Sequence, residues 1–175
     1  MSCDISRGRL EPCKDSVGGL NAVYFVNKGD IDAVTYDATD TDVIDAVTGT
    51  PTAYKFDIKG GSTYTENITS SRENGTTTFE QVLELQLTKL TKEDHKTVKL
   101  LAYGSPTVLI EDNNGNVFVA GLEHGLDVSG GTIVSGAAMG DMSGYTLTFS
   151  GMEKAPANFL GDTISAAGFS VTEGA

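Results

Sequence analysis

The most regular alternation of apolar and polar residues in the chain lies near residue 145. Tyr145, Leu147 and Phe149 alternate with threonine or serine residues. In a strand this period places three large apolar side chains on one face and three hydroxyl groups on the other. Turns containing glycine bound the segment on both sides. We therefore predict a strand over residues 145–152 that contributes Tyr145, Leu147 and Phe149 to the core.

Other segments with the composition of strands follow one another along most of the chain. They are residues 21–27, 31–36, 53–58, 62–70, 76–90, 107–111, 116–120 and 132–138. The first of them is apolar without alternation, which indicates a buried strand. In the longest of them, Leu83, Leu85 and Leu87 share a face with Phe79 and Gln81.

Short turns rich in glycine join several of these strands. Gly60-Gly61 and Asn74-Gly75 are two-residue sequences that accept the positive φ angles of tight hairpins. They predict a three-stranded meander over residues 53–90. Asp112-Asn113-Asn114-Gly115 predicts a further hairpin, and Asp141 is interpreted as a turn residue.

One helix is predicted near residues 91–103. Thr91 is a suitable N-cap, and acidic residues follow in the first turn, where the helix dipole favours them. Gly104 ends the pattern. Val98, Leu101 and Ala102 fall on one face, which we expect to pack on the sheet.

These elements predict a mainly β fold, an antiparallel β-sandwich or barrel with one α-helix packed on the outside. A chain of 175 residues is long enough to bury the core of one domain. Residues 1–19 have little periodicity and end in a glycine pair. We interpret them as an extended N-terminal arm, followed by a single domain over residues 20–175.

Residues 37–49 are acidic and rich in threonine, which predicts an exposed loop with one helical turn near residues 43–47. We expect this loop to have no local core of its own and therefore to become ordered on assembly. Its acidic residues form a candidate assembly loop: Asp37, Asp40, Asp42 and Asp45.

The net charge of −12 argues against tight binding of nucleic acid. From residue 100 to residue 175 the only basic residue is Lys154. A protein that binds DNA or RNA tightly needs a basic surface to displace counterions. We expect any contact with DNA to be transient and non-specific.

The sequence indicates neither a metal site nor a cofactor site. Cys3 and Cys13 are too few for a zinc site and are interpreted as unpaired thiols, with a disulfide between them as the alternative. Residues 112–123 have a spacing like that of a calcium loop, but Val117 stands where the loop needs glycine. The hairpin is the preferred interpretation there, and a cation bound by residues 37–45 is a weaker alternative.

No set of residues suggests catalysis. His95 is expected on a solvated helix and His124 in a turn between glycines, so neither has a nucleophile and an orienting acid beside it. Phosphate-binding and nucleophile-elbow motifs are missing from the sequence. We therefore expect a protein that is not an enzyme.

The first residues contain no apolar segment of the signal-peptide type, and no apolar run approaches the roughly 18 residues of a membrane span. We expect synthesis in the cytoplasm and no membrane partner.

Two stretches resemble virion structural proteins of bacteriophages. In the C-terminal half the pattern is Gly121-x3-Gly125, then Gly136-x3-Gly140-Asp141-x2-Gly144-Tyr145-Thr-Leu-Thr-Phe, then Glu153-x2-Pro156. It is most similar to tail tube proteins. The N-terminal stretch from Gly8 to Phe25 resembles the opening of structural proteins from phages of Bacteroidetes-type hosts. Capsid decoration and head-tail connector proteins share some of these features and are the alternative.

The resemblance implies a β-sandwich or barrel subunit of a virion tail, which self-assembles into rings of six that stack into a tube for DNA ejection. Its partners would be itself and other tail or head-completion proteins. Six copies would carry a formal charge of −72, and an acidic lumen would repel phosphates and let DNA pass. The candidate lumen-lining acids lie beside the predicted meander: Asp57, Glu66, Glu73, Glu80 and Glu84.

Overall fold

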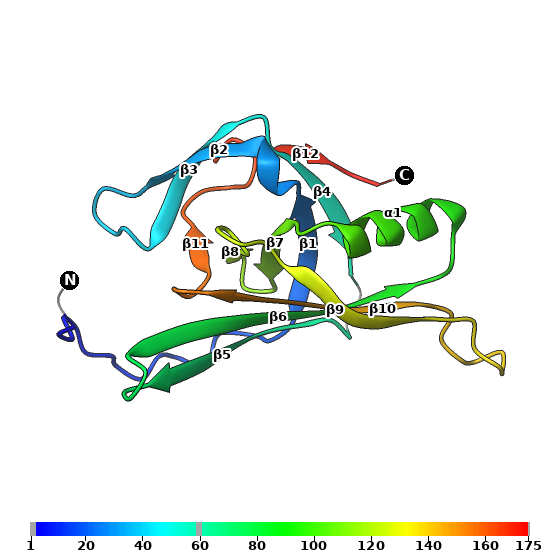
Figure 1. Ribbon diagram of the computed structural model, residues 1–175, viewed down its shortest axis with the longest axis horizontal. Coiled ribbons are helices and arrows are strands. Elements are labelled where there is room, and N and C mark those ends of the chain that lie inside the picture. Colours follow the sequence, from blue (N-terminus) through cyan, green and yellow to red (C-terminus); the bar gives the residue numbers. More distant parts are fainter. Residues whose placement is uncertain (1–2, 59–60, 175) are drawn as a thin grey trace.

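The strands of the protein form two sheets in the computed structural model, which describes residues 3–58 and 61–174 (Figure 1). The first sheet has eight strands in the order β12-β4-β1-β7-β8-β11-β3-β2. Their bounds are β1 Leu20–Val26, β2 Ile31–Tyr36, β3 Val43–Gly49, β4 Thr52–Asp57, β7 Thr107–Asp112, β8 Val117–Ala120, β11 Asn158–Leu160 and β12 Ser170–Thr172.

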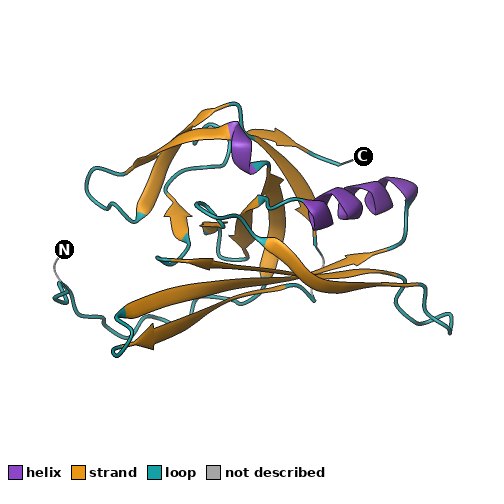
Figure 2. Cartoon of the chain, in the orientation of Figure 1, coloured by secondary structure: helices purple, strands orange, loops and turns teal. Residues whose placement is uncertain are grey.

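The second sheet has four strands in the order β5-β6-β10-β9. Their bounds are β5 Thr63–Ser71, β6 Thr76–Thr88, β9 Asp127–Val134 and β10 Gly144–Glu153. All of its neighbours are antiparallel. A short 3₁₀ helix, η1 (Lys28–Asp30), and one α-helix, α1 (Lys92–Tyr103), complete the described elements (Figure 2).

The two sheets pack face to face around what we call the first core. In its centre Leu147 lies opposite Leu85, and Phe149 lies opposite Leu83, on adjacent strands of the second sheet. Phe149 also contacts Phe25 of β1, with 5.3 Å between ring centroids. Tyr145, Leu147 and Phe149 are all buried, which confirms the prediction for this strand. The fold is therefore the predicted mainly β sandwich with one α-helix.

A second core lies on the opposite face of β1. Val23 and Phe25 belong to the first core, whereas Ala22, Tyr24 and Val26 belong to the second. The other buried members of the second core come from β3, β4, β7, β8 and the C-terminal segment: Ile44, Val47, Ala53, Leu109, Val119, Leu160, Ile164, Ala167 and Phe169. Because β1 is buried on both faces, its sequence is apolar without alternation, as predicted.

Helix α1 begins after Thr91, whose hydroxyl accepts a hydrogen bond from the Asp94 amide at 3.1 Å, and Gly104 follows its last turn. The predicted bounds are confirmed. The packing is weaker than predicted, because Val98 is the one buried residue of the helix and Leu101 is half-buried, whereas Ala102 is exposed. The helix covers only one end of the first core, so it packs through a single row of apolar side chains.

Three predictions about the strands are wrong. Residues 43–49 form strand β3 and contain no helical turn, because Ile44 and Val47 are buried in the second core. Strand β4 lies in the first sheet, so it makes no hairpin with β5, although Gly60 itself lies outside the described residues. The predicted strand at 132–138 is β9 and begins earlier, at Asp127.

The hairpins at Asn74-Gly75 and at residues 112–115 are confirmed. In the second, the Asp112 carboxylate accepts hydrogen bonds from the amides of Asn114 at 3.0 Å and Asn116 at 2.8 Å. Residues 3–19 contain no helix or strand and are exposed throughout. Their described contacts with the domain are made near Val17 and Gly18, with Asn113 and Asn114.

Candidate assembly surface

The second sheet has one face against the first core and one face turned away from it, which we call the open face. The open face follows from the register, because Thr63, Glu84 and Thr148 lie in one row across β5, β6 and β10. These residues alternate with the buried ones, and Thr63, Glu84 and Thr146 are exposed. In Figure 1 this sheet is the lowest layer, and the first sheet and α1 lie above it.

The open face is polar and bears no positive charge. Its side chains are mostly hydroxyls and amides, with Val82, Val134 and Met152 as apolar members: Thr63, Thr65, Asn67, Thr69, Thr78, Glu80, Val82, Glu84, Gln86, Thr132, Val134, Thr146, Thr148, Ser150 and Met152. Glu80 and Glu84 are its carboxylates. None of the four strands contains a lysine, arginine or histidine. The face should therefore repel anions along the whole length of its strands.

Both edges of this sheet are open within the chain. Strands β5 and β9 each pair with a single neighbour. Ile68 on β5 is 69% exposed and Ile133 on β9 is 53% exposed. Neither strand contains lysine or proline, the residues that commonly protect an edge from pairing with another chain. The pairing of β9 with β10 has a register shift opposite Thr148 and Phe149, and bulges also protect edges. The β5 edge is therefore the more regular of the two.

The structure separates the five candidate lumen-lining acids. Glu80 and Glu84 lie on the open face, and Glu73 lies in the turn between β5 and β6. Glu66 lies on the opposite side of β5, where it accepts hydrogen bonds from the Tyr64 hydroxyl at 2.5 Å and the Ala157 amide at 2.9 Å. The Tyr64 pKa is raised above its ordinary value by burial and by Glu66. Glu66 therefore joins elements of the subunit.

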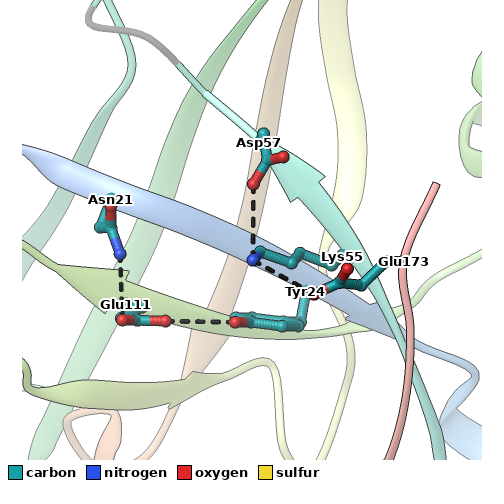
Figure 3. Close-up of polar contacts among 6 residues, drawn as sticks. All are labelled: Asn21, Tyr24, Lys55, Asp57, Glu111 and Glu173. Carbon is teal, nitrogen blue, oxygen red and sulfur yellow. Dashed lines mark hydrogen bonds and ion pairs between the residues drawn. The ribbon is translucent and has the colours of Figure 1, made fainter. Parts of the chain in front are cut away.

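Asp57 lies on β4 of the first sheet, in the cluster of polar contacts that Figure 3 shows. Lys55 lies 3.7 Å from Asp57 and 3.6 Å from Glu173, near the end of the chain. Beside them Glu111 accepts hydrogen bonds from the Tyr24 hydroxyl at 3.2 Å and from the Asn21 side chain at 3.0 Å (Figure 3).

Tyr24 belongs both to this polar cluster and to the second core. We therefore call the cluster the rim of the second core. Burial and the adjacent Glu111 carboxylate raise the pKa of Tyr24 from 10.0 to about 12. The polar contacts thus join β1, β4 and β7 to the C-terminal segment. Asp57 is a member of this rim and is distant in the topology from the open face.

The acidic residues of the candidate assembly loop shape their own backbone. Asp37 accepts hydrogen bonds from the amides of Thr39 at 2.7 Å and Asp40 at 3.0 Å, and these bonds lower the pKa of the Asp37 carboxyl. The Asp40 carboxylate accepts one from the Asp42 amide at 3.1 Å. Asp45 lies within β3. The exposed loop is therefore the short link between β2 and β3, beyond the first sheet (Figure 1).

A second loop, between β9 and β10, extends beyond the end of the second sheet (Figure 1). Asp141 organises it by accepting hydrogen bonds from the amides of Ala137 at 3.0 Å and Ala138 at 2.8 Å, which confirms its prediction as a turn residue. These bonds lower the pKa of the Asp141 carboxyl. Met139 in this loop is fully exposed. No pattern in the sequence predicted that this loop extends beyond the sheet.

The two histidines have different surroundings. Nδ1 of His95 forms a hydrogen bond with the Tyr145 hydroxyl, so this residue ties the helix to β10. His124 lies near Glu123 and Glu153, and one potential ligand atom from each lies within 4.8 Å of the others. Cys3 and Cys13 are exposed free cysteines.

Comparisons of this chain with protein-family models, with curated proteins and with solved structures find no match. Among the residues that the structure describes, no helix has both the length and the apolar character to cross a membrane.

Proposed function

We propose that this chain is a virion structural protein, the subunit of a bacteriophage tail tube. The observation that carries the proposal is the second sheet, which combines a polar, acidic open face with two unpaired edge strands. A monomeric protein ordinarily protects such edges. An edge left open along nine residues of β5 and eight of β9 fits a protein that pairs with copies of itself.

In the proposed assembly, β9 of one subunit pairs with β5 of the next. Repeating this contact around a ring continues the four-stranded sheet from subunit to subunit and leaves no free edge once the ring closes. The open face then lines the lumen. Glu80 and Glu84 present carboxylates there without a basic residue on the same strands, which keeps DNA phosphates from adhering.

Contacts between stacked rings are assigned to the segments that project from the sheets. In residues 3–19 the side chains of Ile5 and Leu10 are 93% and 92% exposed. The link between β2 and β3 and the loop bearing Met139 also project. Exposed apolar residues in such segments are typical of surfaces that become buried on assembly.

Negative-stain microscopy of the purified protein tests the proposal. We expect hollow tubes, or rings that stack as concentration rises. Discrete rings that never stack, or a monomer that binds only to capsids, would overturn the tube assignment in favour of a connector or decoration protein.

The edge contact has its own test. Ile133→Lys and Ile68→Lys each place an ammonium group at an open edge and should abolish tubes while leaving the thermal unfolding of the monomer unchanged. Thr146→Lys puts the same charge in the middle of the open face and is the matched control, which should still form tubes. If the two edge variants assemble normally, β5 and β9 do not form the contact.

A further inference from the structure

Buried polar side chains are concentrated around one turn, residues 121–125, which links β8 to β9. The Gly121 amide donates a hydrogen bond to Gln81 Oε1 at 2.8 Å, and its carbonyl accepts one from the Thr107 hydroxyl at 3.1 Å. Glu153 accepts a third, from the His124 amide at 3.0 Å. Among the described residues these are three of the four buried polar side chains, the fourth being Ser62.

The backbone of the turn leaves little room for movement. Gly121 and Gly125 have φ angles of +68° and +76°, and a Cβ atom at Gly125 would lie 2.5 Å from the Ser105 carbonyl oxygen. Glycine is required at both positions. The turn therefore fixes the backbone positions of Glu123 and His124, although their exposed side chains remain free to rotate.

Glu153, at the end of β10, is a buried carboxylate without a cation. It is 7% exposed, and its Oε1 atom accepts the His124 amide hydrogen bond. In the part of the chain that the structure describes, no lysine or arginine pairs with it, and no donor is bonded to its second oxygen. No buried side-chain oxygen among the described residues lacks a hydrogen-bond partner, so the second Glu153 oxygen is accessible to solvent and free to bind a cation.

The adjacent side chains supply the other ligands. Glu123 and His124 each bring one potential ligand atom to within 4.8 Å of a Glu153 oxygen and of each other. Glu123 and Glu153 also border a hollow of about 180 Å³. Around a zinc ion, ligand atoms lie about 2.0–2.2 Å from the metal, so rotation of the exposed Glu123 and His124 side chains is needed to close the set.

We infer that Glu123, His124 and Glu153 form a binding site for a divalent transition-metal ion of the zinc type. An imidazole nitrogen with two carboxylates suits Zn²⁺ better than Ca²⁺, which prefers oxygen ligands alone. Two carboxylates balance the charge of the ion. The site is separate from the open face and independent of the proposed assembly.

The Lys154 ammonium group would compete with the metal ion for the Glu123 carboxylate. Its ammonium nitrogen lies 3.1 Å from Glu123 Oε1, and both side chains are substantially exposed. Metal binding would replace this ion pair. Removing the ammonium group should therefore strengthen binding of the metal, an effect that a purely structural role for the cluster does not predict.

The test is isothermal titration of the untagged full chain with Zn²⁺, and with Ca²⁺ in parallel. Because the exposed thiols of Cys3 and Cys13 can bind zinc themselves, all variants carry Cys3→Ser and Cys13→Ser. We expect one Zn²⁺ per chain and no heat with Ca²⁺. Titration with Co²⁺ in place of Zn²⁺ should give visible absorption bands.

Three variants define the ligands. His124→Gln keeps the backbone amide that donates a hydrogen bond to Glu153. It should weaken zinc binding at least about tenfold, since loss of even a residue that only contacts a metal ligand lowers metal affinity roughly 10–100-fold. Lys154→Met should tighten it. His95→Gln alters the only other histidine of the chain and should leave the affinity unchanged.

Failure of Zn²⁺ to bind the Cys-free chain would overturn the inference, as would binding that His124→Gln leaves unaltered. In either case Glu153 only caps the turn. Glu153→Gln separates the two roles, because its amide oxygen can still accept the His124 hydrogen bond. If Glu153 only accepts this bond, the melting temperature should respond to Zn²⁺ as in the parent, whereas loss of a ligand should remove the stabilisation by Zn²⁺.

Discussion

The two cores lie on opposite faces of β1 and are built in different ways. The first core is formed by long antiparallel strands, and β6 pairs with β10 along ten residues. The second is formed by short pieces, including β11 and β12 with three residues each, which make parallel pairs with β3 and β4. Long regular strands repeat a pattern often enough to be recognised, whereas short parallel ones do not.

The largest expected effect comes from the first core. Phe149→Ala removes a fully buried ring that contacts Phe25, and should lower the free energy of unfolding by about 3–5 kcal/mol. For a domain of this size that corresponds to a melting temperature lower by roughly 6–20 °C. Calorimetry measures it, and a shift of only about a degree would show that the ring is not buried.

The matched change in the second core is Phe169→Ala. This ring is 3% exposed, so a cost near the lower end of the same range, about 3 kcal/mol, is expected if both cores unfold together. Urea unfolding followed by tyrosine fluorescence and by circular dichroism should give coincident transitions. Two separate transitions would show instead that the second core unfolds by itself.

A smaller effect is expected at the start of α1, which covers the end of the first core. Thr91→Ala removes the hydroxyl that accepts the Asp94 amide hydrogen bond and should cost about 1 kcal/mol. Thr91→Ser retains the cap and is the control. Equal melting temperatures for the two variants would exclude a contribution from the cap.

The smallest effect concerns the rim of the second core and depends on pH. The folded protein holds the pKa of Tyr24 at about 12, above its ordinary value of 10.0. The fold therefore favours the neutral phenol. This contribution to stability is complete below pH 10 and is lost as the pH rises toward 12.

Tyr24→Phe should consequently make stability less sensitive to alkaline pH, as measured by urea midpoints between pH 9 and pH 11. Tyr103→Phe is the control, since that ring is 80% exposed. An identical alkaline loss in the parent and in Tyr24→Phe would mean that the phenol ionises normally.

Prediction from the sequence succeeded for the first core and missed much of the second core. Alternation around Leu83 and Phe149 correctly predicted the first core. Ile44 and Val47 stand among aspartates and threonines, and Phe169 follows a run of small residues, so these positions lacked a recognisable period. Their partners lie far away in the sequence: Leu160 pairs with Ile44.

The candidate surfaces show the same limit. The period of β6 placed Glu80 and Glu84 on one face, and the alternation that joins Tyr64 to Glu66 could have excluded Glu66 from it. The strand of Asp57 was wrongly assigned to the meander, because alternation specifies the face of a strand and not the sheet to which the strand belongs. The approach of Glu153 to His124 joins residues 29 positions apart and left no local signal.

Burial of β1 on both faces also has a kinetic meaning. Its backbone is paired with β4 on one side and β7 on the other, so no local fluctuation at an edge or loop exposes its amides. Hydrogen exchange at Val23, Tyr24 and Phe25 can then occur only when the whole domain opens. These three amides would report the global free energy of unfolding.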